Sequence, residues 1–285
     1  NNEGDGLKIQ EVIKRGPFAV KKNEVTAGCI IEKIDGEAIK AGKDYNALLD
    51  GKAGKNVRLT IKNTKGKTFD LTIKAISQGD QQELLYKRWV DRNRAIVDSV
   101  SKGRIAYVHV KAMNSESFRT VYSELLSDKN RNKDAVIVDE RHNGGGWLHD
   151  DLCTLLSGKQ YQEFVPHGKV VGKDPFNKWT KPSCVLICED DYSNGHGFPW
   201  VYKELGIGKL IGTPVAGTMT AVWWETLMDR RLVFGIPQVG CRDMRGTFGE
   251  NTTLYPHVEV YNSPEDYITG HDTQLIRAVE EMMKK

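Results

Sequence analysis

From Arg104 onward, short apolar segments alternate with amphipathic segments, and this alternation constrains the fold more than any other feature of the chain. The predicted strands are 105–110, 135–138, 184–188 and 210–212, and the predicted helices are 118–126, 148–156, 198–205 and 273–283. The strand segments are almost continuously apolar, which is typical of strands buried on both faces. We therefore predict an α/β core domain over 104–285, with a mostly parallel sheet covered by helices. Sites in such domains form where the strands end.

The first 76 residues follow a different pattern, in which short apolar runs are separated by turn residues. The runs 57–61 and 69–73 alternate apolar and polar residues around Lys65-Gly66, which is typical of a β-hairpin. The segment 45–49 can form one short helix. These observations predict a small β-rich domain over 1–76, followed by a helical connector over 77–103.

Composition excludes several classes of protein. Among the 285 residues, 41 Lys and Arg oppose 38 Asp and Glu, and the net charge of +3 is too small to indicate nucleic acid or an anionic membrane as the main partner. No apolar run approaches the roughly 18 residues that a membrane span needs. The opening residues contain neither Met nor a signal-peptide core, so we expect a part of a longer protein.

Cysteine spacing and the absence of nucleotide motifs predict neither a metal nor a cofactor. The five cysteines form no Cys-x-x-Cys pair, so neither a disulfide framework nor a zinc site is indicated. Cys184 and Cys188 lie at the ends of an apolar run, where a free cysteine behaves as a small buried apolar residue. Neither Gly-x-Gly-x-x-Gly nor a phosphate-binding Gly-Lys-Ser/Thr loop is present.

Two loops at predicted strand ends carry the candidate catalytic residues. The strand ending at Asp139 continues into the glycine triplet 144–146, whose backbone N–H groups could bind an oxyanion, although such turns also serve close packing. The next strand continues into Ser193-Asn194-Gly195, a tight turn before a helix. Ser193 is placed there like a nucleophile, and it could equally act as the N-cap of that helix.

The motif Asp139-x-Arg141-x-Asn143-x-Gly145-Gly146 resembles the Asp-x-Arg-x-Asn-x-Gly-Gly motif of the C-terminal processing serine peptidases, family S41. The segments 104–110, 205–212 and 263–275 resemble the tricorn-like branch of that family, and the resemblance covers 7–285. Within the first domain, 28–36 resembles a PDZ domain, with a generic small β-barrel as the alternative. The resemblance implies a ClpP/crotonase-like strand-helix core, preceded by a PDZ-like domain that binds the C-terminus of an extended peptide.

The resemblance also implies the catalytic residues. Counting back from the Leu-Gly-x-Gly segment that begins at Leu205 makes Ser193 the nucleophile, whereas an alignment on the preceding tyrosine would put Gly195 there and imply an inactive enzyme. Asn194 stands where the family has Asp. The backbone N–H groups of Asn194 and Gly145 are expected to form the oxyanion hole.

Two further roles concern the acid and the base. Glu250 matches the acid that completes the catalytic relay, with a solvated loop carboxylate as the alternative. The family's general base lies in a Thr-Ser-His segment upstream of the PDZ domain, which these 285 residues do not contain. His196 follows Ser193 by three residues, and we expect it to be exposed and turned away from the hydroxyl. We expect His109, in its apolar strand, to be a satisfied core residue.

Two functions follow from this resemblance. The first is a serine peptidase that acts on a peptide or protein substrate without a cofactor, the present chain lacking its base. The second is a catalytically inactive peptide-binding protein, which is suggested by Asn194 and by Gly217-Thr218, where the family has paired glycines. A homo-oligomer is plausible because tricorn assembles into rings. A periplasmic or secreted location is favoured over a cytoplasmic one because bacterial relatives are commonly exported.

Overall fold

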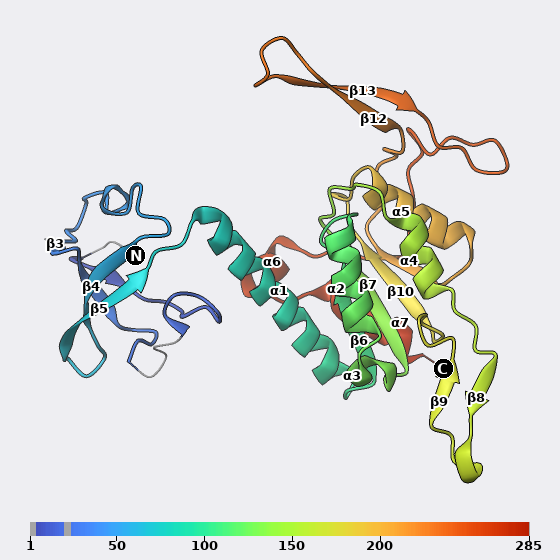
Figure 1. Ribbon diagram of the computed structural model, residues 1–285, viewed down its shortest axis with the longest axis horizontal. Helices are drawn as coiled ribbons and strands as arrows, with labels where there is room; N and C mark the ends of the chain where they lie inside the picture. The colour runs from blue at the N-terminus through green and yellow to red at the C-terminus, as the bar shows by residue number, and fades with distance from the viewer. Residues whose placement is uncertain (1–3, 20–23, 285) are drawn as a thin grey trace. The chain divides into compact units, whose positions relative to one another are not determined.

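The computed structural model describes residues 4–19 and 24–284 (Figure 1). The chain divides into two compact units, 1–92 and 93–285, and the boundary falls within the long helix α1 (Gln78–Val100). Residues 1–3 and 20–23 of the predicted β-rich domain lie outside the described ranges. No helix in those ranges is long and apolar enough to cross a membrane.

The first unit is built on an antiparallel sheet, as its alternating segments predict. Its strands are ordered β1 (Leu7–Lys8), β2 (Ile30–Ile34), β4 (Asn56–Lys62) and β5 (Thr68–Lys74), and β3 (Glu37–Ala38) pairs with β2. β4 and β5 form the predicted hairpin. Alternate residues of β4 are buried in the core of this unit because one sheet face is covered. The predicted short helix is a single 3-10 turn, η2 (Asn46–Leu48).

The second unit contains the predicted parallel sheet. Its strands follow chain order, and every neighbouring pair is parallel: β6 (Ile105–His109), β7 (Ala135–Asp139), β10 (Ser183–Ile187), β11 (Lys209–Gly212) and β14 (Val258–Glu259). All residues of β6, β7 and β10 are buried, which explains their continuous apolar sequence. The α/β fold class is therefore confirmed.

Helices cover both faces of this sheet (Figure 1). On one face, α2 (Ser115–Leu125), α4 (His149–Leu156) and α5 (Asn194–Glu204) share a buried apolar cluster with alternate strand residues. On the other face, α7 (Thr273–Met283) contacts β7, β10 and β11. The short helices α3 (Asp128–Arg131) and α6 (Pro264–Thr269) lie in connections.

Two hairpins project from this unit (Figure 1). One consists of β8 (Gln162–Phe164) and β9 (Gly172–Asp174), with the turn η3 (Pro166–Gly168) between them. The other consists of β12 (Ala221–Thr226) and β13 (Val233–Val239). The sequence pattern predicts strand and loop after Thr213 without resolving this second hairpin, and it predicts nothing of β8 and β9.

Candidate active site

The loops that follow β7 and β10 meet at the carboxyl ends of these adjacent parallel strands. The backbone N–H of Tyr192 donates to the Asn143 carbonyl at 2.9 Å. The Asn143 N–H donates to Oδ1 of Asp191 at 3.1 Å. Parallel pairing places both loops at the same sheet edge, so the glycine triplet and Ser193 lie together as predicted.

Gly145 is packed directly against the candidate nucleophile. A Cβ atom at this position would lie 2.7 Å from the Ser193 Cβ and 3.0 Å from the Asn194 nitrogen, and the Gly145 φ is +93°. Both the close approach and the positive φ require glycine. Gly195 is equally constrained, because a Cβ there would lie 2.6 Å from the Asn143 carbonyl oxygen. Of the two positions proposed for the nucleophile, Ser193 is the one with room for a side chain.

Ser193 has a strained backbone conformation, and its side chain does not cap the helix that follows. Its φ is +56° and its ψ is −118°, and its side chain makes no capping hydrogen bond to α5. Ser193 therefore occupies the N-cap position of α5, but its side chain does not cap the helix. The Ser193 N–H donates to Oγ1 of Thr218 at 2.9 Å, which holds the turn. Strain at a sharp strand-to-helix turn is typical of an exposed serine nucleophile.

The two N–H groups expected to bind the oxyanion differ in whether they already have a hydrogen-bond acceptor. The Asn194 N–H begins α5 and has no acceptor in the described part of the chain. The Gly145 N–H donates to Oδ1 of Asn143 at 2.9 Å. Asn143 is fully buried, and its Nδ2 donates to the Val110 carbonyl at 2.8 Å, so its orientation is fixed. A substrate oxyanion would have to share or replace the Asn143 oxygen to reach Gly145.

The Asn194 side chain explains the departure from the family's Asp at this position. Its Oδ1 accepts hydrogen bonds from the backbone N–H groups of Leu148 at 2.8 Å and His149 at 3.1 Å, which caps α4. Its Nδ2 lies 2.9 Å from Nδ1 of the His149 ring. An amide satisfies both demands, since it accepts at one atom and donates at the other.

Glu250 belongs to the same group of loops as Ser193. Its Oε2 accepts a hydrogen bond from the Thr220 backbone at 2.8 Å, so it is not a freely solvated carboxylate. The neighbouring Asn251 N–H donates to the Gly217 carbonyl at 3.0 Å. Gly217-Thr218-Met219-Thr220 therefore contacts both Ser193 and the Glu250 segment. No hydrogen bond joins Glu250 to Ser193 within the described ranges.

His196 is not the exposed loop residue that the sequence suggested. Because α5 begins at Asn194, its first turn places His196 in the core, where it is fully buried and its ring packs edge-on against Trp200. Burial lowers the pKa of His196 to about 4, and the nearby Glu250 carboxylate opposes this effect. In the described structure neither ring nitrogen makes a hydrogen bond.

In the described structure no histidine is hydrogen-bonded to Ser193 as a general base would be. All seven lie in the described ranges, and none is hydrogen-bonded to the Ser193 hydroxyl. His109 is the predicted core residue: it is buried, and its Nε2 lies 3.2 Å from the Arg141 carbonyl oxygen.

The Asp-x-Arg part of the motif forms a buried hydrogen-bond network at the end of β7. The buried Arg141 guanidinium donates to both Asp139 oxygens, at 2.9 and 2.8 Å, and to both Asp272 oxygens at 2.9 Å. Burial alone would raise the pKa of Asp139, but Arg141 holds it below its usual value. This network ties the end of β7 to the start of α7.

Sequence reasoning assigned no role to three residues that shape the site. Thr218 holds the Ser193 backbone, Asn143 engages the Gly145 N–H, and buried Asp191 accepts from the Cys188 and Asn143 backbones. The run Glu189-Asp190-Asp191 is a signal for a loop, but nothing in it distinguishes the buried carboxylate from the exposed ones. Cys184 and Cys188 are buried, as predicted.

Comparison with known proteins gives matches over both units of the chain. The profile of peptidase family S41 matches residues 104–260, and that of the Tricorn protease PDZ domain matches 7–78. The Tricorn protease of Thermoplasma acidophilum is 30% identical over 259 residues, which cover 90% of this chain and 24% of that protein. A putative Tricorn-like protease C-terminal subunit of Sulfurisphaera tokodaii is 29% identical over 276 residues, covering 95% and 31% respectively.

A solved structure gives the same result. The crystal structure of the tricorn protease superimposes with a TM-score of 0.83 at 27% identity, over 97% of this chain and 27% of that one. The chain thus spans about a quarter to a third of the length of these relatives. The first unit carries a tricorn-type PDZ domain rather than a generic β-barrel. With more than half of its residues matched by the family profile, the chain belongs to peptidase family S41.

Proposed function

We propose that this chain carries the nucleophile and oxyanion hole of a serine peptidase that cleaves peptide or protein substrates. The observation that carries the proposal is the Ser193 turn. Ser193 has a strained backbone, and its side chain does not cap α5. Beside it lie the Asn194 N–H, which has no acceptor in the described part of the chain, and Gly145, which has no room for a side chain. The Ser193 oxygen attacks the substrate carbonyl carbon and its proton passes to a base. The amine then leaves with a proton, and water releases the acyl group.

The oxyanion that forms in this reaction would be bound by the Asn194 N–H, with support from the positive end of α5. The Gly145 N–H joins it when the oxyanion displaces or shares the Asn143 oxygen. Loss of one such donor typically costs about 10²–10³ in turnover. An anion competes well with an amide oxygen for this N–H because hydrogen bonds to charged acceptors are stronger.

The base would come from outside these 285 residues, and Glu250 would complete the relay. This proposal is supported by the absence, in the described structure, of a hydrogen bond between the Ser193 hydroxyl and any of the seven histidines, and by the greater length of the relatives. Without a base, a serine hydroxyl is a poor nucleophile, and removal of one triad member costs about 10⁴–10⁶ in turnover.

The experiment compares peptide hydrolysis by this chain with hydrolysis by a longer protein that includes an upstream Thr-Ser-His segment. We expect the short chain to fold and to hydrolyse peptides near background, and the longer protein to be active. Ser193→Ala should abolish that activity, whereas Ser123→Ala, on the exposed side of α2, should not. Activity that survives Ser193→Ala would mean that the nucleophile is elsewhere. Full activity of the short chain would show that it contains its own base.

A purely peptide-binding function is less well supported, because a binding protein gains nothing from the strained Ser193 turn. The PDZ domain at 7–78 could nevertheless deliver substrates. If Ser193→Ala leaves peptide binding intact and abolishes cleavage, binding and catalysis are separate functions of one chain.

We also propose that the chain self-associates through the β12–β13 hairpin. Trp224 is 71% exposed, and Trp223, Val233 and Phe234 are also exposed. Within the described structure these two strands form a sheet by themselves, so both edges are open to pairing with a second copy. Sedimentation should show an oligomer that Trp224→Lys weakens; a monomeric wild type would refute the proposal.

A further inference from the structure

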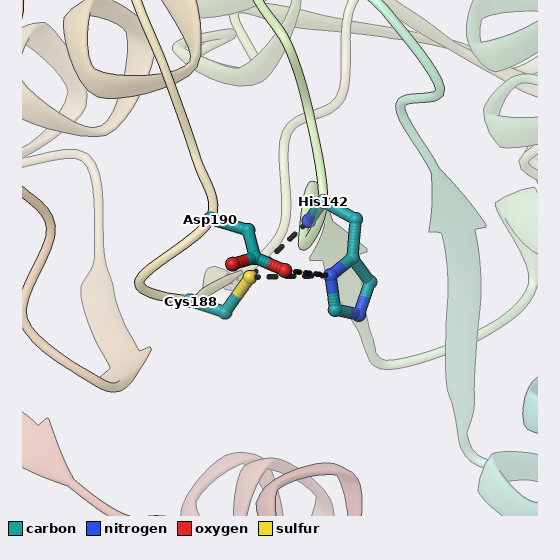
Figure 2. Close-up of side chains that lie close together, drawn as sticks. All are labelled: His142, Cys188 and Asp190. Atoms are coloured by element: carbon teal, nitrogen blue, oxygen red, sulfur yellow. Dashed lines mark hydrogen bonds and ion pairs between the residues drawn. The ribbon is translucent and has the colours of Figure 1, made fainter.

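Three side chains from two different loops converge beside the candidate active site. His142 follows β7, whereas Cys188 and Asp190 follow β10. The His142 Nδ1 lies 2.9 Å from Oδ2 of Asp190 and 3.7 Å from Sγ of Cys188. Figure 2 shows the sulfur and the carboxylate facing the same ring nitrogen. The three potential ligand atoms all lie within 4.8 Å of one another.

The same three atoms can serve either a hydrogen-bond network or a small divalent cation. As a network, the His142 Nδ1 donates to the Asp190 carboxylate, and the Cys188 thiol donates to Oδ1 of Asp191 at 3.7 Å. This is not a catalytic triad, since a base with an orienting carboxylate uses its two ring nitrogens for its two partners. A cation placed among the three atoms would satisfy all of them at once.

The spacing of the ligand atoms supports this interpretation. Zinc–sulfur bonds of about 2.3 Å and zinc–nitrogen bonds of about 2.0 Å, at a tetrahedral angle, separate the two ligand atoms by about 3.5 Å. The observed Nδ1···Sγ separation of 3.7 Å is close to that value. The observed Nδ1···Oδ2 separation of 2.9 Å is shorter than the roughly 3.3 Å between a nitrogen and an oxygen ligand of zinc, so the Asp190 carboxylate would have to move outward slightly. Small side-chain adjustments suffice, because the His142 and Asp190 side chains are both more than half exposed.

The ligand types select among cations. A thiolate and an imidazole favour zinc and similar transition metals, whereas calcium and magnesium prefer oxygen ligands. The backbone also positions the ligands: the His142 N–H donates to the Cys188 sulfur at 3.2 Å, and His142 has a φ of +67°.

We propose that His142, Cys188 and Asp190 bind one zinc-type divalent cation, with a fourth position open to water or to an external ligand. His142 immediately precedes Asn143, which contacts both Gly145 and the loop that leads to Ser193. The cation would therefore join the glycine loop to the nucleophile loop. The sequence could not reveal this site, since 46 residues separate His142 from Cys188.

The test measures zinc binding by the reduced, metal-free chain in equilibrium dialysis. We expect one zinc per chain, a rise of a few degrees in the unfolding midpoint of the second unit in excess zinc, and a thiolate-to-metal absorption band with cobalt. Cys188→Ser, His142→Asn and Asp190→Asn should each weaken binding by more than the roughly 10–100-fold cost of losing a ligand-orienting partner. Asparagine tolerates the positive φ at position 142.

Control variants separate this site from unspecific thiol binding. Cys241→Ser removes the half-exposed thiol outside the cluster and should leave zinc binding unchanged. If Cys188→Ser fails to fold, His142→Asn and Asp190→Asn still decide the matter because both side chains are exposed. Absence of zinc binding, binding that follows Cys241, or binding that survives both exposed substitutions would each overturn the proposal.

Discussion

The single hydrogen bond from the Ser193 backbone to Thr218 holds the candidate nucleophile in a conformation that serine rarely adopts. Thr218→Val keeps the shape of the side chain and removes the acceptor, which leaves a partly buried N–H unpaired at a cost of about 1–3 kcal/mol. We expect kcat of an active, longer form of the protein to fall about tenfold or more, with Thr218→Ser close to wild type. A Thr218→Val enzyme with unchanged kcat would show that the turn needs no such support.

Glu140 makes stability depend on pH. It is fully buried, neither of its oxygens has a hydrogen-bond partner in the described structure, and burial together with Asp191 and Asp139 raises its pKa well above the usual value. A carboxyl group with a raised folded pKa favours folding below its unfolded pKa of about 4.3 and loses that contribution as pH rises.

Glu140→Gln removes the ionisation and preserves the shape. The variant should exceed the wild type in free energy of unfolding at pH 8, and the difference should shrink toward pH 4. Urea denaturation across this range measures it, with the exposed Glu225→Gln as control. A difference that is constant with pH would mean that folding does not raise the pKa of Glu140.

At the scale of elements, the starts of α4 and α5 are joined through one side chain. Asn194→Ala removes the oxygen that caps α4 and should lower the free energy of unfolding by about 1–2 kcal/mol. Asn194→Asp keeps that oxygen, so it should cost less than Asn194→Ala. Equal stability of Asn194→Ala and wild type in urea denaturation would contradict the capping role.

Helices and strands were predictable from the sequence where a periodic apolar pattern or a motif marks them. The buried strands and the closing helix 273–283 follow from local apolar patterns, and Ser193 and Gly145 meet because parallel strands end at one sheet edge. His196 was misplaced because the start of α5 differs from the predicted one by four residues, a full helical turn. Thr218 and the His142–Cys188–Asp190 cluster depend on contacts between distant segments, for which no local pattern exists.

At the scale of the molecule, each unit has its own apolar core, and the larger unit also carries a buried charge network. Arg141 connects Asp139, at the end of β7, to Asp272, at the start of α7, across 131 residues of chain. The network therefore links two segments of the 93–285 unit that are far apart in the sequence. Asp139 and Arg141 are both almost completely buried, so each charge depends on the other.

Arg141→Met should leave Asp139 as an unpaired buried charge, at a cost of about 3–5 kcal/mol. In a unit of this size that corresponds to a fall of roughly 6–20 °C in the unfolding midpoint. Calorimetry should show the lowered transition in the unit with the parallel sheet. The double variant Arg141→Met with Asp139→Asn should recover part of the loss, because the fully buried charge of Asp139 is removed and only Asp272 keeps a charge without its Arg141 partner. If Arg141→Met is as stable as the wild type, the Asp-x-Arg motif has no structural role. If the double variant recovers no stability, the structural role lies in the contact of Arg141 with Asp272 instead.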